Sequence, residues 1–222
     1  MARPPADPDA PITADQVARE LHLLIDELVA AEADATALHT IQGHIDDARG
    51  ELAEHPRSRY WERDGAADYR QLSPYRGPAN PVAPPMVITS TSTGSGTGAR
   101  FVGEVHVPAM YEGPPKCVHG GFLAGLFDEI MGATQAAAPG GAGLTGRLVV
   151  RYRRPTPIDT PLRFTSWIER TSKSFTSVAA QCHNGEQLTA EATGLFMAPR
   201  PATNAASTSN AASTTEEGST SL

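Results

Sequence analysis

The most constraining feature of this sequence is one long apolar helical stretch that stands among strand-like runs. The segment from Gly120 to Ala137 carries large apolar residues at helical spacing and stops before Pro139, which predicts one helix that starts at a Gly-Gly pair. Two strand-like runs precede it and four follow it, and Asn184-Gly185 between the last two is a strong hairpin signal. One helix among antiparallel strands predicts an α+β fold in which the sheet wraps around the helix.

Composition divides the chain into five segments. A Pro- and Asp-rich start and an Ala/Ser/Thr/Asn-rich end cannot offset the entropy of ordering, so both are expected to be disordered. Thr13 and Gln16 fit a capping box that opens an amphipathic helical hairpin, and a connector dense in Pro, Gly and aromatic residues follows it. The expected segments are a disordered start at 1–12, a helical hairpin at 13–55, a connector at 56–85, the sheet-and-helix domain at 86–199 and a disordered tail at 200–222.

Charge and cysteine content narrow the class of protein. The net charge of -7 argues against nucleic-acid binding, whereas four arginines within 147–154 suit a small anionic ligand. Cys117 and Cys182 cannot make a disulfide framework, and neither has the spacing of a metal ligand, so no metal or cofactor is expected. No signal peptide or apolar stretch of membrane-spanning length is visible, which predicts a cytoplasmic protein without stable membrane insertion.

The predicted helix carries a stripe of small residues with one carboxylate in it. On a helical wheel the stripe consists of Gly121, Gly125, Asp128 and Gly132. Each glycine costs about 1 kcal/mol relative to alanine in a helix, and the resulting groove lets another backbone or a ligand come close. At the helix start, free N–H groups of Gly120 and Gly121 can donate to an oxyanion or a polarised carbonyl.

Spacing along the helix predicts that two candidate site residues come from different chains. Asp128 follows His119 by nine residues, which separates them by about 13.5 Å along the axis and places them on opposite faces. One chain cannot bring both to the same small substrate. If they cooperate, the carboxylate must come from a second subunit, and the protein is a symmetric dimer with two composite sites.

The run YEGPPKCVHGGFLAGLFDEIMG, followed by LTGRLVVRYRRPTPIDTPL, resembles the PaaI-type hotdog-fold thioesterases over about residues 80–199. The resemblance implies a hotdog fold, a homodimer or homotetramer, and hydrolysis of acyl-CoA thioesters. It implies that the Gly120 N–H polarises the thioester carbonyl and that Asp128 of the partner subunit drives the attack, as general base or as nucleophile.

The same resemblance implies roles for two further residues. A third role, that of an asparagine side chain, has no matching residue in this chain. Thr145 matches a hydroxyl that positions water or the acid, and His119 matches a histidine that shapes the turn near the carbonyl. Many relatives carry an asparagine near the position of Gly113, so the role of that amide does not carry over to this chain.

Several side chains could bind the substrate, and each also has a structural interpretation. Gly121 belongs to the turn at the carbonyl. The arginine fork suits phosphate, so Arg153 and Arg154, with Lys173, are the candidates for the phosphates of coenzyme A. Strand-edge arginines can instead keep an edge soluble. Glu129 is expected to pair with an arginine at the subunit contact. Phe122, Phe127 and Met131 could line an acyl pocket or belong to the core.

Two other functions compete with thioester hydrolysis. A hotdog hydratase or dehydratase needs a histidine beside an acid or amide at a different spacing. A non-catalytic acyl-CoA-binding module would use the helical hairpin as an accessory, but it has no need of Asp128 near a thioester. Cys117 and His119 could be read as a nucleophilic pair, although a small buried cysteine beside a turn is the better interpretation.

Overall fold

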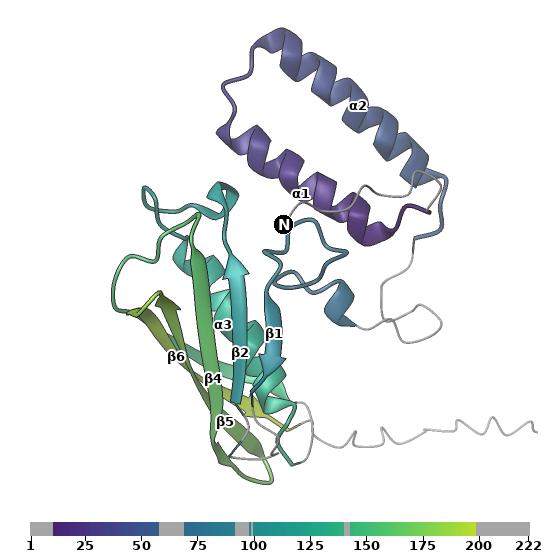
Figure 1. Cartoon of the computed structure of the whole chain (residues 1–222). Coiled ribbons are helices and arrows are strands. Elements are labelled where there is room, and N and C mark those ends of the chain that lie inside the picture. The colour runs from purple at the N-terminus through teal and green to yellow at the C-terminus, as the bar shows by residue number, and fades with distance from the viewer. Residues whose placement is uncertain (1–10, 58–68, 92–97, 99, 140–142, 199–222) are drawn as a thin grey trace, which may run out of the picture.

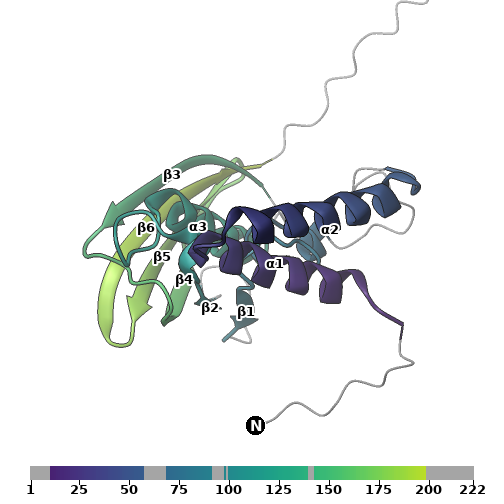
Figure 2. The same ribbon diagram turned by 90° about the horizontal axis from the view of Figure 1, so that it is seen from above.

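A single antiparallel sheet of six strands wraps around one helix in the computed structural model, which describes residues 11–57, 69–91, 98, 100–139 and 143–198. The elements are α1 (Ala14–Ala30), α2 (Ala35–Ala53), η2 (Tyr69–Gln71), β1 (Val87–Ser90), β2 (Arg100–His106), η4 (Ala109–Tyr111), α3 (Gly120–Gln135), β3 (Leu144–Tyr152), β4 (Pro161–Thr171), β5 (Phe175–Asn184) and β6 (Gln187–Met197). The strand order is β1-β2-β4-β5-β6-β3, so β1 and β3 form the two edges (Figure 1 and Figure 2). The predicted α+β hotdog arrangement is confirmed.

The core forms where α3 lies against the sheet. Its buried side chains recur at helical spacing and include Leu126, Phe127 and Ile130, which are fully buried. The Phe127 ring meets Phe164 of β4 edge to face at 5.1 Å. Each such side chain contributes about 1.5–3 kcal/mol by leaving water, which holds the helix in the curve of the sheet. Phe127 and Met131 therefore belong to the core, whereas Phe122 is only partly buried.

One irregularity in β3 changes which way its first residues point. The pairing of β3 with β6 shifts register between Thr145 and Arg147, as a β-bulge does. Leu148 packs against the core and therefore marks the face of β3 that is turned to α3. In a regular strand Thr145 would point to the opposite face, since it is an odd number of residues away. The bulge turns its side chain toward α3 instead.

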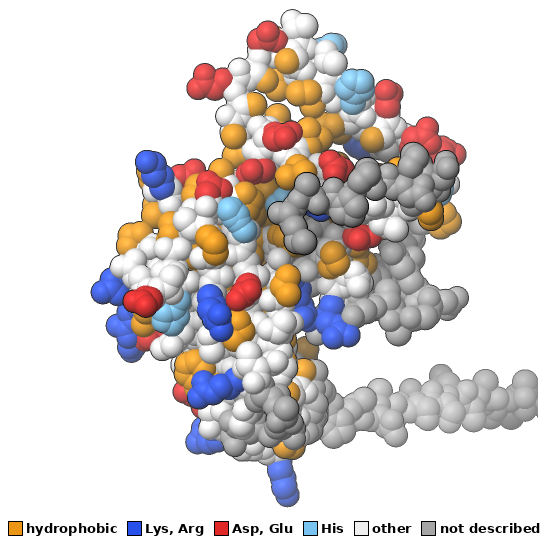
Figure 3. Space-filling model, viewed as in Figure 1, with side chains coloured by type: hydrophobic (Ala, Val, Ile, Leu, Met, Phe, Trp, Pro, Cys, Tyr) orange, Lys and Arg blue, Asp and Glu red, His pale blue; other side chains and the backbone are white. Residues whose placement is uncertain are grey.

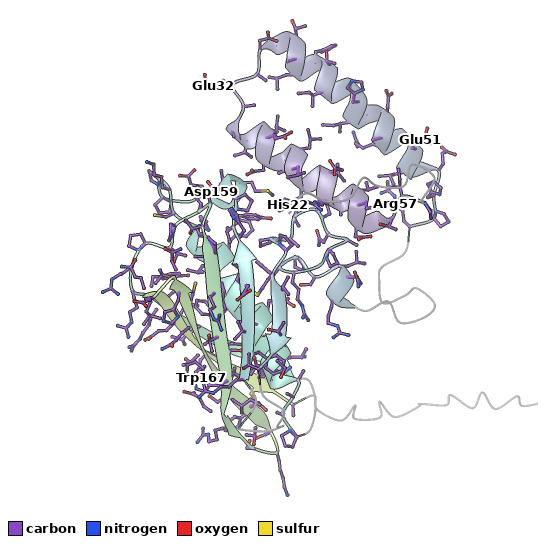
Figure 4. The ribbon with its side chains drawn as sticks, in the orientation of Figure 1. His22, Glu32, Glu51, Arg57, Asp159 and Trp167 are labelled. Atoms are coloured by element: carbon purple, nitrogen blue, oxygen red, sulfur yellow. The ribbon has the colours of Figure 1, made fainter. Side chains whose placement is uncertain are left out.

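The helical hairpin lies beyond one end of the sheet. Thr13 and Gln16 make the predicted capping box of α1. The Asp26 carboxylate accepts a hydrogen bond from the Met110 N–H at 2.9 Å, and the His22 ring bonds to the Pro81 carbonyl at 3.1 Å. Figure 4 shows His22 at this junction. Apolar side chains remain exposed between acidic ones along both helices (Figure 3), and α2 buries none of its residues.

Parts of the predicted organisation fall outside the described residues. The disordered ends expected at 1–12 and 200–222 lie there almost completely, as does the connector from 58 to 68. The rest of the connector folds beside β1 and reaches α3 through Glu129. Among the described residues, every helix is too short or too polar to cross a lipid bilayer.

Candidate active site

The start of α3 is a tightly fixed turn around His119. The His119 N–H donates to the Tyr111 carbonyl at 2.8 Å, and His119 Nδ1 accepts from the Gly121 N–H at 3.0 Å. A nitrogen that accepts carries no proton, so the ring hydrogen of His119 is at Nε2 in this arrangement. The Gly121 N–H is therefore already occupied. The Gly120 N–H has no acceptor among the described residues and can donate to a ligand.

Gly120 is held in place by the far end of β3. The Tyr152 hydroxyl donates to the Gly120 carbonyl at 2.7 Å. A Cβ on residue 120 would lie 3.3 Å from the Tyr152 ring and hydroxyl, so the two residues are in contact. Tyr152 was not predicted as a site residue, although it is the tyrosine of the quoted strand end RYRRP. Tyr152 contacts the turn only because the fold brings β3 next to α3, and no pattern in the local sequence indicates this contact.

Gly113 packs against the same turn. A Cβ at this position would lie 2.8 Å from His119 Cα and 3.0 Å from its Cδ2. Any larger residue would therefore require the loop to shift. The backbone N–H of Gly113 donates to the Cys117 carbonyl at 2.9 Å, which closes the turn before the helix. An asparagine in place of Gly113 would thus not fit without a shift of the loop. This is a steric reason for glycine at this position.

Asp128 and Thr145 are in contact. The Thr145 hydroxyl donates to Asp128 Oδ1 at 2.9 Å. The bulge in β3 makes this bond geometrically feasible, because it turns Thr145 toward the helix. Asp128 is partly exposed, so its second oxygen is left for water or substrate. Within one chain Asp128 is eight residues beyond Gly120, about 12 Å along the axis.

A cleft of about 420 Å³ opens beside Gly120. Its wall includes Tyr152, Arg153 and Arg154. The Arg153 guanidinium forms an ion pair with Glu191, whereas the Arg154 guanidinium donates only to the Leu188 carbonyl at 3.3 Å. Arg154 therefore keeps its positive charge uncompensated by any carboxylate among the described residues and is the better anion ligand of the two.

Lys173 stands apart from the other predicted substrate-binding residues. It lines a separate depression with Gln135, at the C-terminal end of α3. One chain thus brings Gly120, Arg153 and Arg154 together around one cleft. It brings Asp128 and Thr145 together at another point along α3, and it leaves Lys173 near neither group.

Glu129 pairs with an arginine of its own chain, and its expected place at a subunit contact stays a prediction. Glu129 Oε1 lies 2.5 Å from Arg76 Nε, and its Oε2 accepts a hydrogen bond from the Ser73 hydroxyl at 2.7 Å. Both partners belong to the connector of the same chain. The predicted open stripe is also partly filled, because Tyr75 covers Gly125: a Cβ there would lie 2.1 Å from the Tyr75 ring.

The two cysteines differ in their surroundings. Cys182 is fully buried, and burial raises the pKa of its thiol to about 12, so it stays protonated at neutral pH. Cys117 takes part in the turn through its backbone. Within the described ranges, no group of three or more His, Cys, Asp or Glu side chains could hold a metal ion.

Comparison with known proteins connects this geometry to one family. Residues 116–191 match the sequence model of the Thioesterase superfamily, and these residues include the turn, α3 and most of the sheet. The acyl-coenzyme A thioesterase THEM4 of Xenopus laevis is 37% identical over 93 residues, which are 40% of this chain and 41% of that protein. The protein of the same name from Bos taurus is 31% identical over 88 residues, 39% of this chain and 35% of that protein. The chain therefore spans less than half the length of these curated relatives.

A solved structure matches more of the chain. The crystal structure of protein RHA08564, described as a thioesterase superfamily protein, superposes with a TM-score of 0.71 at 28% sequence identity. The match covers 86% of this chain and 97% of that chain. The likeness thus extends well beyond the residues that the family model matches.

Proposed function

Because its residues 116–191 match the sequence model of the Thioesterase superfamily, we propose that this chain hydrolyses acyl-CoA thioesters to a free acid and coenzyme A. In this proposal the Gly120 N–H of one subunit polarises the thioester carbonyl, and Asp128 of the partner subunit drives the attack. One observation carries the proposal. Gly120 and Asp128 are each tied to β3, at opposite ends of that edge strand.

Val149 marks the midpoint of β3 between these two contacts. Thr145, which lies before it, binds Asp128, and Tyr152, which lies after it, binds Gly120. The partners on β6 of Thr145, Val149 and Tyr152 are Phe196, Thr193 and Ala190, which are evenly spaced. If a second copy pairs its β3 antiparallel around Val149, the Thr145 end of each strand meets the Tyr152 end of the other. Asp128 of each subunit then lies beside Gly120 of its partner.

The edge of β3 is suited to such pairing. It is an edge strand of nine residues whose side chains are mostly exposed, and on one side its backbone has no neighbouring strand within the described part of the chain. Exposed N–H and C=O groups of that kind favour pairing with another strand. Antiparallel pairing of two identical strands around a two-fold axis closes the assembly at two copies, and a tetramer would need a further contact.

The chemistry follows from the residues at the composite site. A hydrogen bond from the Gly120 N–H draws electron density onto the carbonyl oxygen and stabilises the oxyanion that forms during attack. The partner's Asp128 either removes a proton from water, which then adds to the carbonyl carbon, or adds to that carbon itself to form an anhydride that water cleaves. Both routes end with an acid and a thiolate leaving group, and both need the ionised carboxylate that Thr145 orients.

The cleft beside Gly120 gives the coenzyme a place to bind. Arg154 carries a positive charge with no carboxylate partner among the described residues, at the wall of the same cleft. Phosphate groups prefer such a guanidinium. A thioester with its carbonyl at the Gly120 N–H would thus direct its coenzyme portion into this cleft and its acyl portion toward α3 of the partner subunit.

The direct test is hydrolysis of a panel of acyl-CoA substrates by the wild type and by Asp128→Asn. We expect kcat to fall by at least about a hundredfold, as for other catalytic acid–base groups, with little change in acyl-CoA binding. The neighbouring Glu129→Gln is the matched control, since it removes a carboxylate one position away and acts on stability through Arg76. Full activity in Asp128→Asn would exclude the mechanism. Acyl-CoA binding without hydrolysis in the wild type would favour the non-catalytic binding module.

A further inference from the structure

The connector next to α3 is held in one conformation. We call residues 69–86 the strap. Within it the Gly77 N–H donates to the Ser73 carbonyl at 2.9 Å, and the Ala79 N–H donates to the Gln71 carbonyl at 3.0 Å. A Cβ at Gly77 would lie 2.5 Å from the Gln71 carbonyl oxygen, so this fold of the backbone requires glycine there. The strap is therefore a built element and not a loose linker.

The strap is anchored to α3 next to the proposed catalytic carboxylate. The Arg76 and Glu129 side chains are only 13% and 14% exposed, and their atoms Nε and Oε1 are 2.5 Å apart. Ser73 adds a hydrogen bond to the other oxygen of Glu129. Removing one partner of a largely buried pair leaves a charge without compensation, which makes this anchor hard to release. Because Glu129 directly follows Asp128, the anchor fixes the strap at the same level along the helix.

Tyr75 covers the helix surface at the same level. A Cβ at Gly125 would lie 2.1 Å from Tyr75 Cζ and 2.5 Å from its hydroxyl oxygen, so the ring rests directly on the helix backbone. Residues three apart on a helix are neighbours on its surface. Gly125 and Asp128 have this spacing, so the part of the helix surface that Tyr75 covers adjoins Asp128. No hydrogen bond to the Tyr75 hydroxyl is formed within the described part of the chain.

We propose that Tyr75 forms the wall of the acyl pocket and limits the length or bulk of the acyl group. This inference rests on the proposed function. There, the reacting carbonyl lies between the Gly120 N–H of one subunit and Asp128 of the partner subunit, and the coenzyme portion occupies the cleft lined by Arg154. The acyl group leaves the carbonyl carbon on the other side, along the helix that carries Asp128. Tyr75, held by the strap, covers the adjoining part of that helix.

The test compares kcat/KM for acetyl-CoA and dodecanoyl-CoA in full-length variants. Tyr75→Ala removes the wall, so the ratio of dodecanoyl to acetyl should rise by about tenfold or more through a lower KM for the long substrate. Tyr75→Leu is a smaller change and serves as the second variant if Tyr75→Ala folds poorly. It should also raise the ratio of dodecanoyl to acetyl. Val82→Ala is the matched control, because Val82 lies on the same strap with a 47% exposed side chain. Its ratio should equal that of the wild type.

The outcomes separate this proposal from the proposed function. An unchanged ratio in folded Tyr75 variants that still hydrolyse acyl-CoA would overturn the role of Tyr75 and leave the hydrolase intact. If the wild type hydrolyses no acyl-CoA, the proposed function fails. In that case the role of Tyr75 is tested by binding. The affinities of non-hydrolysable thioether analogues with two-carbon and twelve-carbon chains are compared in the wild type and in Tyr75→Ala. A relative gain for the long analogue in Tyr75→Ala supports the wall, and equal affinities refute it.

Discussion

At the scale of single residues, the candidate site depends on which hydrogen bonds are already formed and which are left open. His119 takes up the Gly121 N–H, so the Gly120 N–H remains for a ligand. Thr145 binds one oxygen of Asp128, so the other oxygen remains. Each functional group is thus oriented by a neighbour of the same chain, which is the preorganisation that electrostatic catalysis needs.

The Thr145 hydroxyl should therefore matter for kcat more than for stability. Thr145→Val keeps the shape of the side chain but removes the hydrogen bond to Asp128, which lies in an exposed position where water can take the place of the hydroxyl. We expect kcat to fall by about tenfold or more, with KM and thermal stability nearly unchanged. Thr145→Ser keeps the hydroxyl and should retain most of the activity. Equal kcat values for the two variants, measured on the best acyl-CoA substrate, would show that this bond does not orient the acid.

At the scale of elements, α3 was predictable from the sequence and the strap was not. The apolar spacing between Gly120 and Ala137 is a local signal, and the structure has the helix at Gly120–Gln135. The strands follow the same kind of local pattern. The bulge that aims Thr145 is a single-residue shift, and alternation along the strand would have placed that side chain on the wrong face. Long-range contacts such as that of Tyr75 with Gly125 produce no periodic pattern in the sequence. The connector was therefore expected to be ordered and to lie over a surface, but the sequence did not indicate which surface.

The glycines of α3 provide a matched pair of stability measurements. A methyl group at Gly125 would run into the Tyr75 ring, whereas one at Gly132 would meet nothing within 4 Å. We expect Gly132→Ala to raise the free energy of unfolding by about 1 kcal/mol, the usual helix preference for alanine. Gly125→Ala should lower it, because the strap must move. Urea denaturation of both variants tests this, and a stabilised Gly125→Ala would mean that Tyr75 does not rest on the helix.

At the scale of the whole molecule, both edges of the sheet are exposed but only one is proposed to pair. Val149 lies midway between the residues of β3 that contact Asp128 and Gly120, and Val87 lies on β1 at the other edge. In the proposed dimer Val149 faces its own copy, so Val149→Lys would place two like charges directly opposite each other. We expect this variant to dissociate into monomers and to lose hydrolysis, whereas Val87→Lys should keep both. Light scattering at matched concentrations tests the assembly, and a dimeric, active Val149→Lys would rule out pairing around this residue.

The central claim is that each site combines the Gly120 N–H of one subunit with Asp128 of the other, and co-expression of two inactive variants tests it most directly. Gly120→Pro removes the N–H at a position where helices tolerate proline, and the extended ψ of 129° at His119 suits a following proline. Gly120→Ala keeps the N–H and serves as its control. Co-expressed with Asp128→Asn, the proline variant should form heterodimers with one intact site of two. Random assembly then predicts about a quarter of wild-type activity. Heterodimers that form and remain inactive would contradict the shared site.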